Sequence, residues 1–296
     1  MVVTPLAKAS FISGYAAYEN GDYATAFEEI FPIAEAGDAH SQYLIAQMYQ
    51  KGEGAPRNYS EAARWFRKAA RQGLHIAQFS LGVLYQRGEG VPHDYSEAAK
   101  WFEKAAQQGL HSAQFRLGFL HQNGHGFPQD YSKAAEWYRK AAEQGHSQGE
   151  FYLGQLYKEG HGVPQDNSKA LIFIRRAAER GLPVAQFTLG VEYKIGEIVP
   201  KDPAKTAKWY QRAAEQGLAS VQYQLGALYS IGEGVPKDYV LAHKWTNLSV
   251  AIGLPDDLRL RAIENRNLLE TFMTKAQVAE AQKLARKWME KHNNAQ

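Results

Sequence analysis

The chain has 296 residues, of which 45% are hydrophobic and 12% aromatic, enough for a buried core and too many for a disordered tail protein. Its 34 basic and 31 acidic residues give a formal net charge of +3 without any run of five like charges, which argues against a nucleic-acid partner. Cysteine is absent, so disulfides and thiolate chemistry are excluded, and no run of about 18 apolar residues is present to form a transmembrane helix.

Residues 1–10 precede the first predicted helix, and we expect them to be flexible. They are too short, and lack the early basic residues, to be a complete secretory signal. However, Ala7, Lys8 and Ala9 have the A-x-A form of a signal-peptidase site and follow several apolar residues. Two explanations are open: the end of a longer export signal, or an ordinary frayed terminus.

Three residue types recur every 36 residues through most of the chain, with Phe173 the one interruption of the tryptophan series. The series are Trp65, Trp101, Trp137, Trp209 and Trp245; Pro56, Pro92, Pro128, Pro164, Pro200 and Pro236; and Gly37, Gly73, Gly109, Gly145, Gly181, Gly217 and Gly253. Six units of 36 residues fit between Asp38 and Gly253. This spacing predicts six structural repeats, with a segment left over at each end.

Each unit is predicted to hold two helices, as its second copy illustrates. Apolar residues at three- and four-residue spacing predict a first helix, helix A, over 75–86. Asp94 followed by Glu97 resembles a capping box that starts helix B over about 95–107. A small residue such as Gly82 lets the two backbones approach closely. The helix-breaking residues of the intervening loop are Gly88, Gly90 and Pro92.

The strings A-Q-F-S-L-G-V-L-Y-Q-R-G-E-G-V-P (77–92) and A-Q-F-R-L-G-F-L-H-Q-N-G-H-G-F-P (113–128) resemble the Sel-1-like repeat, a relative of the tetratricopeptide repeat with a longer loop. The resemblance covers at least residues 38–253. It implies an all-α fold, a right-handed solenoid of antiparallel helix pairs whose A helices line a concave face. It also implies a role as an adaptor or scaffold for other proteins.

Both ends of the chain are predicted to cap the repeats. In residues 11–37 the short turn G-D-Y-A-T-A-F replaces the longer loop and resembles an ordinary tetratricopeptide unit. In residues 254–296, a helix is expected from Pro255 through about Leu269, and Thr274 with Gln277 resembles the capping box of a second helix. Helices with a polar outer side close the exposed end of a repeat array.

One region departs from the repeat pattern. Ile198 stands where other units have a second loop glycine, and Pro203 stands where they have tyrosine or asparagine. Because a β-branched residue resists positive φ, we expect the loop at Ile198 to differ in shape. Two interpretations are open: drift repaired by local repacking, or a bend or contact surface between Phe173 and Pro203.

No converging cluster of acid, base, nucleophile or metal ligand interrupts the repeats. His121, His125 and His161 could be drawn as a metal site, but Gly124 ends the helix that would align the first two. Solvent-exposed loop histidines are the expectation. The G-E-G-V-P loops lack the lysine and the preceding strand of a phosphate-binding loop. We therefore predict no catalytic residue, no metal site and no cofactor.

Helix A offers a candidate binding face if it is oriented as in tetratricopeptide repeats. One position on it is aromatic in every unit: Tyr43, Phe79, Phe115, Phe151, Phe187 and Tyr223. Rigid rings suit peptide recognition, although a ring repeated in every unit more often packs between adjacent A helices. Two further positions vary: Gln47, Val83, Phe119, Gln155, Val191 and Ala227, then Gln50, Gln86, Gln122, Lys158, Lys194 and Ser230. We expect the variable glutamines and lysines to give specificity, because packing does not require them.

These observations predict a non-catalytic, monomeric scaffold that binds a protein or peptide along the concave helix A face. The candidate contact residues are Tyr43, Gln47, Phe79, Gln86, Phe115, Phe119, Gln122, Phe151, Gln155, Lys158, Phe187, Lys194 and Tyr223. The alternative is a ligand-processing role towards a cell-wall glycopeptide that uses the three histidines. Because many bacterial proteins that resemble this chain are exported, we favour the periplasm or cell exterior over the cytoplasm.

Overall fold

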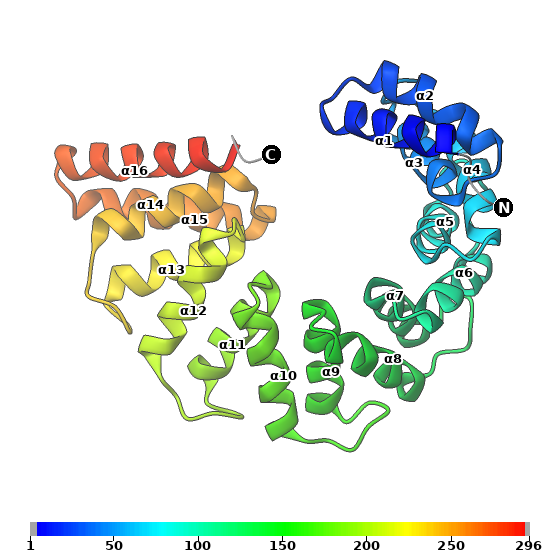
Figure 1. The fold of residues 1–296 in the computed structure, drawn as a ribbon. Coiled ribbons are helices and arrows are strands. Elements are labelled where there is room, and N and C mark those ends of the chain that lie inside the picture. Colours follow the sequence, from blue (N-terminus) through cyan, green and yellow to red (C-terminus); the bar gives the residue numbers. More distant parts are fainter. Residues whose placement is uncertain (1–4, 294–296) are drawn as a thin grey trace. The chain divides into compact units, whose positions relative to one another are not determined.

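A computed structural model describes residues 5–293 of the chain and the side chains of residues 11–292. Within that range it contains sixteen helices and no strand (Figure 1). The N-terminal pair is α1 (Pro5–Glu19) and α2 (Tyr23–Glu35). Then follow α3 (Ala39–Lys51), α4 (Tyr59–Arg71), α5 (His75–Arg87), α6 (Tyr95–Gln107), α7 (His111–Asn123), α8 (Tyr131–Glu143) and α9 (Ser147–Glu159). The remaining helices are α10 (Asn167–Glu179), α11 (Pro183–Ile195), α12 (Pro203–Glu215), α13 (Ala219–Ile231), α14 (Tyr239–Ile252), α15 (Asp256–Thr271) and α16 (Lys275–Asn293).

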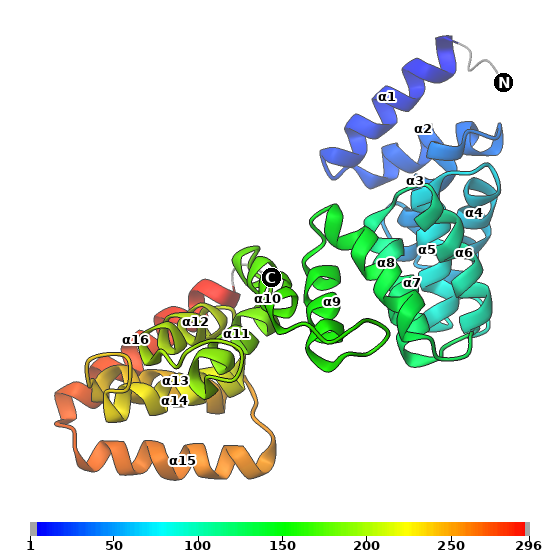
Figure 2. The ribbon, with the colours of Figure 1, turned by 90° about the horizontal axis from the view of Figure 1, so that it is seen from below.

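The helices form consecutive pairs, as the 36-residue spacing predicts. The chain divides into two compact units, Met1–Gly149 with Gly160–Pro164, and Glu150–Glu159 with Gln165–Gln296. Within each unit, successive helices pack against each other from α1 to α8 and from α10 to α15, and α14 also contacts α16 (Figure 2). This stacking of antiparallel pairs confirms the all-α solenoid architecture. Among residues 5–293, no helix has both the length and the apolar character that a membrane span needs.

The helix bounds in the second repeat agree closely with the prediction. Helix α6 begins and ends as expected, and α5 extends one residue further than expected, to Arg87. The Asp94 carboxylate accepts hydrogen bonds from the backbone N–H groups of Ser96 and Glu97, at 2.8 and 3.0 Å. The reciprocal half of the capping box is not formed, because the Glu97 carboxylate pairs with Lys100 at 2.5 Å. Only the N-cap half of that prediction is therefore correct.

The predicted C-terminal capping box is complete. The Thr274 backbone N–H donates to Gln277 Oε1 at 2.8 Å, and the Gln277 N–H donates to Thr274 Oγ1 at 3.3 Å. At the other end, α1 begins at Pro5 rather than near residue 11, so the backbone of Ala7 and Ala9 lies within a helix. Residues 1–4 of the segment expected to be flexible lie outside the described residues.

The loop at Ile198 differs from the other repeat loops, as its sequence predicts. Where the other loops have a second glycine, that glycine has a positive φ, for example +69° at Gly90. No non-glycine residue of the described chain has a positive φ, so Ile198 does not adopt that conformation. Its neighbour Val199 is buried, and Pro203 begins α12, where the missing N–H is not needed. These contacts agree with local repacking of the region. A bend or contact surface between Phe173 and Pro203 stays a prediction.

Buried glutamines connect successive repeats. Gln42 Nε2 donates to the Ala34 carbonyl of the preceding helix at 3.1 Å, and Gln72 Nε2 donates to Gln42 Oε1 at 2.9 Å. The same glutamine–glutamine hydrogen bond recurs at Gln108 with Gln78, Gln144 with Gln114, and Gln216 with Gln186. The glutamine–glutamine bonds join the two helices of one repeat, whereas the bonds to a carbonyl, such as Gln42 to Ala34 and Gln78 to Ala70, reach the preceding helix pair. Together they satisfy polar groups that would otherwise be costly to bury.

His146 is expected to make the first unit sensitive to acid. It stands where leucine occurs at 74, 110, 182 and 218, its ring stacks on Phe115 at 5.0 Å, and its Nδ1 accepts the Gly149 N–H at 3.1 Å. Burial, followed by the charges of His111 and Arg116, lowers the pKa of His146 to about 4 from 6.5. The unfolded chain therefore takes up a proton between these pH values that the folded unit does not, and stability is lost as pH falls through this window.

We expect His146→Leu to remove about 2 kcal/mol of this pH dependence, after allowing for partial exposure of the ring. The measurement is urea unfolding of both proteins at about pH 7 and about pH 4.5, compared as the difference in unfolding free energy. His40→Gln, a change at an exposed histidine, serves as the control. An undiminished pH dependence in His146→Leu would show that another group is responsible.

Candidate partner-binding face

The repeated aromatic residues of helix A pack mainly inside their own repeats. In four repeats the helix A ring lies against an aromatic ring of helix B, with centroids 5.5 to 5.7 Å apart. The pairs are Tyr43 with Phe66, Phe79 with Phe102, Phe115 with Tyr138, and Phe187 with Tyr210. Phe115 and Phe151 are only 6% exposed. These rings therefore have a packing role, as one alternative expected, but the recorded ring contacts are to helix B of the same repeat rather than between adjacent A helices.

Several of the variable positions also have structural contacts. Gln47 Nε2 donates to the Tyr43 hydroxyl at 3.0 Å, and the Tyr138 hydroxyl donates to Gln122 Oε1 at 2.7 Å. The Lys158 ammonium pairs with Glu192 Oε1 at 2.5 Å. The expectation that packing does not require these side chains is therefore wrong for Gln122 and Lys158, since each satisfies a largely buried neighbour.

Three candidate residues remain available for a partner. Gln86, Gln155 and Lys194 make no hydrogen bond or ion pair within the described side chains, and each is partly or fully exposed. In the first unit Gln86 lies on the same helix as the half-buried Val83, and in the second unit Lys194 lies on the same helix as the half-buried Val191. Protein–protein interfaces place polar groups around an apolar centre, and these residues supply both kinds of group.

Glu192 is a buried charge that sequence reasoning missed. Its side chain is 2% exposed, although the corresponding positions 48, 84, 120, 156 and 228 hold methionine or leucine. Lys158 bridges it to the exposed Glu197, with Nζ to Oε2 at 3.3 Å. Burial opposes the charge on Lys158, but the hydrogen bonds and charges of Glu192 and Glu197 outweigh burial and raise its pKa. Aligning the six repeats would have shown the change from leucine to glutamate.

Glu150 is a second buried carboxylate, placed where other repeats have the connecting glutamine. Its Oε2 accepts a hydrogen bond from Arg180 Nε at 3.1 Å, and its Oε1 forms an ion pair with Arg176 Nη2 at 3.0 Å. Arg180 occupies the position of the donor glutamine, Gln72 in the first repeat. An ion pair thus replaces the amide–amide hydrogen bond in this one repeat. Both ion-paired carboxylates lie in the second unit, and both are committed to neighbouring cations rather than to an open site.

The three histidines considered as a metal site do not form one. His121 lies inside α7, is 7% exposed and stacks on Phe127 at 4.3 Å, so the expectation of an exposed loop histidine is wrong for this residue. Burial lowers its pKa. His125 stacks on Tyr95 instead, and His161 lies 4.8 Å from the Tyr131 ring. Among the described residues, no group of three histidine, aspartate or glutamate side chains is arranged to hold a metal ion.

Comparisons with known proteins identify the repeat. The family model for the Sel1 repeat matches residues 39–74, 75–110, 111–146, 147–182, 183–218 and 219–253. The crystal structure of a Sel1 repeat protein from Oxalobacter formigenes is 32% identical, with 88% of this chain and 75% of that chain covered and a TM-score of 0.79. No curated protein sequence matches the chain.

The chain also matches two further solved structures. The protective antigen c5321 of uropathogenic Escherichia coli, which displays an SLR fold, is 31% identical over 96% of this chain and 76% of that chain, with a TM-score of 0.43. The immunity protein Pa5087 from Pseudomonas aeruginosa is 22% identical over 72% of this chain and 81% of that chain, with a TM-score of 0.48.

Proposed function

Because the chain belongs to the Sel1 repeat family, we propose that it is a non-catalytic interaction module that binds a polypeptide partner on its helix A surfaces. The observation that carries the proposal is the set Gln86, Gln155 and Lys194, which the fold does not use and which stand beside partly exposed apolar residues. The commitment of Glu150 and Glu192 to ion pairs supports a binding role over a catalytic one.

The partner would contact the exposed side chains of helix A in each repeat rather than insert between the repeated aromatic rings. Partly exposed Val83 and Phe119 in the first unit, and Val191 in the second, supply apolar area. The side-chain amides of Gln86 and Gln155 and the ammonium of Lys194 can bond a partner's backbone and acidic side chains.

We also propose that the protein is exported, because Ala7, Lys8 and Ala9 have the form of a signal-peptidase site. N-terminal sequencing of the protein from its native source would test this proposal.

Alanine replacement of Gln86, Gln155 and Lys194 together should abolish capture of the partner from native lysate. The wild-type chain and the triple variant would be immobilised and the bound proteins compared by mass spectrometry. The matched control replaces Lys133, Lys169 and Lys205, whose salt bridges are exposed and worth little. A partner bound equally by both variants, or lost from the control alone, would place the binding surface elsewhere.

A further inference from the structure

The last repeat lacks a ring that most other repeats have. In three repeats a helix A glycine lies directly against the helix B ring: a Cβ added at Gly82, Gly118 or Gly190 would be 2.6 to 2.7 Å from a ring atom. The last repeat keeps this glycine, Gly226, but has Thr246 in place of the ring. A Cβ added at Gly226 would meet Thr246 Oγ1 at 2.6 Å, so the threonine replaces the ring edge that lies against the glycine in other repeats. Because threonine is much smaller than phenylalanine or tyrosine, it does not replace the rest of the ring.

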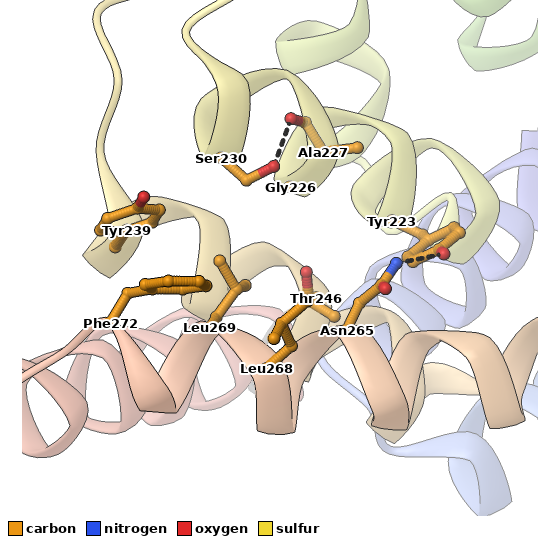
Figure 3. A pocket seen from close by; sticks show the side chains of 10 residues that line it. All are labelled: Tyr223, Gly226, Ala227, Ser230, Tyr239, Thr246, Asn265, Leu268, Leu269 and Phe272. Atoms are coloured by element: carbon orange, nitrogen blue, oxygen red, sulfur yellow. Dashed lines mark hydrogen bonds between the residues drawn. The ribbon is translucent and has the colours of Figure 1, made fainter.

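A cavity of about 200 Å³ lies at this position, and Figure 3 shows its lining. Gly226 and Thr246 form part of the wall, and the side chains of Leu269 in α15 and of Phe272, which directly follows α15, reach it from the opposite side. Phe272 stacks on Tyr239 with centroids 5.6 Å apart. Leu268 and Phe272 are more than half exposed, at 56% and 58%, so the cavity opens to solvent beside α15.

Loss of the ring does not by itself leave a cavity. In the fourth repeat Ile174 replaces the ring, and a Cβ added at Gly154 would meet Ile174 Cγ1 at 2.9 Å. There the isoleucine fills the space, and it is fully buried. In the last repeat the space is instead walled by α15, whose Asn265 donates to the Tyr223 hydroxyl at 2.6 Å and holds the helix in place. A second contact, His243 Nε2 to Glu270 Oε1 at 2.9 Å, fixes the same helix on α14.

We propose that this cavity binds a single aromatic ring. Its lining combines the aromatic rings of Tyr239 and Phe272 with the aliphatic side chains of Leu268 and Leu269, and it also includes Tyr223 and Ser230, which carry hydroxyls. An engineered apolar cavity of about 150 Å³ is large enough to bind benzene. The ligand class is therefore a monocyclic aromatic group, with room at the rim for one hydroxyl. This site goes beyond the proposed helix A surface and does not depend on it.

Titration of the full chain with p-cresol, followed by calorimetry and ligand-observed NMR, tests the proposal. We expect saturable binding to the wild type and at least about a tenfold loss of affinity in Thr246→Phe, which restores the ring of the other repeats. Thr246→Val keeps the side-chain volume and should bind within a few-fold of wild type. Phe272→Ala changes an exposed residue of the cavity wall and should also weaken binding. It therefore tests the site even if Thr246→Phe fails to fold.

Three outcomes would overturn the proposal: no binding of p-cresol to the wild type, equal binding to wild type and Thr246→Phe, or equal binding of 4-methylcyclohexanol, which has the same outline without a π system. The blocked tripeptides Gly-Phe-Gly and Gly-Tyr-Gly distinguish the source of the ring. Competition with p-cresol would assign the site to a side chain of a polypeptide, and p-cresol binding without competition would assign it to a free phenol. Neither result bears on Gln86, Gln155 and Lys194, so the two proposals fail independently.

Discussion

Gly90→Ala is expected to destabilise the first unit by at least about 3 kcal/mol. The residue has a φ of +69°, which costs an L-amino acid about 1–2 kcal/mol. In addition, a Cβ at this position would lie 2.2 Å from the carbonyl carbon and oxygen of Tyr59 and 2.6 Å from the Ser60 nitrogen. Those atoms are backbone at the start of α4, in the preceding repeat, so they can move only if the stacking of the two repeats changes.

Gly73→Ala separates the two contributions. Gly73 has a φ of +93° with no atom within 4 Å of an added Cβ, so only the backbone strain applies and the expected loss is about 1–2 kcal/mol. Both variants would be unfolded in urea and followed by circular dichroism, with hydrogen exchange in α4 as a local readout. Equal losses for the two variants would mean that the close approach of the loop to α4 does not contribute to stability.

The sequence predicted the elements well because local signals and the repeat spacing agree. Glycines and prolines at fixed intervals limit each helix to a narrow range, and Asp94 and Thr274 are N-caps whose chemistry acts within three residues. The change of loop shape at Ile198 was also predictable, since it follows from the side chain of one residue and the sign of one dihedral angle. Each of these features depends on neighbours along the chain.

The candidate site was less predictable because its determinants are long-range. Lys158 and Glu192 are 34 residues apart, and Glu150 pairs with Arg180 at a separation of 30. Sequence spacing placed Lys158 on the helix A stripe, but not the partner that engages it. His121 was expected in an exposed loop for a different reason: its spacing does not show that the turn after α7 brings Phe127 against its ring. Thr246 departs visibly from the aromatic series, yet whether a cavity or a filled core results depends on α15.

Lys158→Gln is expected to destabilise the second unit by about 3 kcal/mol, because it leaves the Glu192 carboxylate buried without a counter-charge. Glutamine is the residue at 50, 86 and 122, so the helix itself tolerates it. The lysine is 27% exposed, which places the estimate at the lower end of the range for broken buried ion pairs. The other carboxylate oxygen of Glu192 has no hydrogen-bond partner among the described residues, so Lys158 provides the main compensation.

Glu192→Leu should behave in the opposite way. It restores the residue found at 84, 120, 156 and 228, removes a buried charge, and leaves Lys158 free to pair with the exposed Glu197. We expect it to be neutral or stabilising by about 1 kcal/mol. Glu197→Gln is the matched control, since it removes the exposed partner of the same lysine and should change stability by less than about 1 kcal/mol.

The double variant Lys158→Gln/Glu192→Leu decides what the lysine does. If Lys158 acts by neutralising Glu192, its replacement costs about 3 kcal/mol alone and nothing in the leucine background, a coupling energy that urea unfolding of the four proteins measures directly. The same loss in both backgrounds would show that Lys158 stabilises the unit through other contacts. The double variant is expected to fold although it lacks the lysine. If it still captures the partner, Lys158 serves stability rather than recognition; if capture is lost, Lys158 belongs to the binding face.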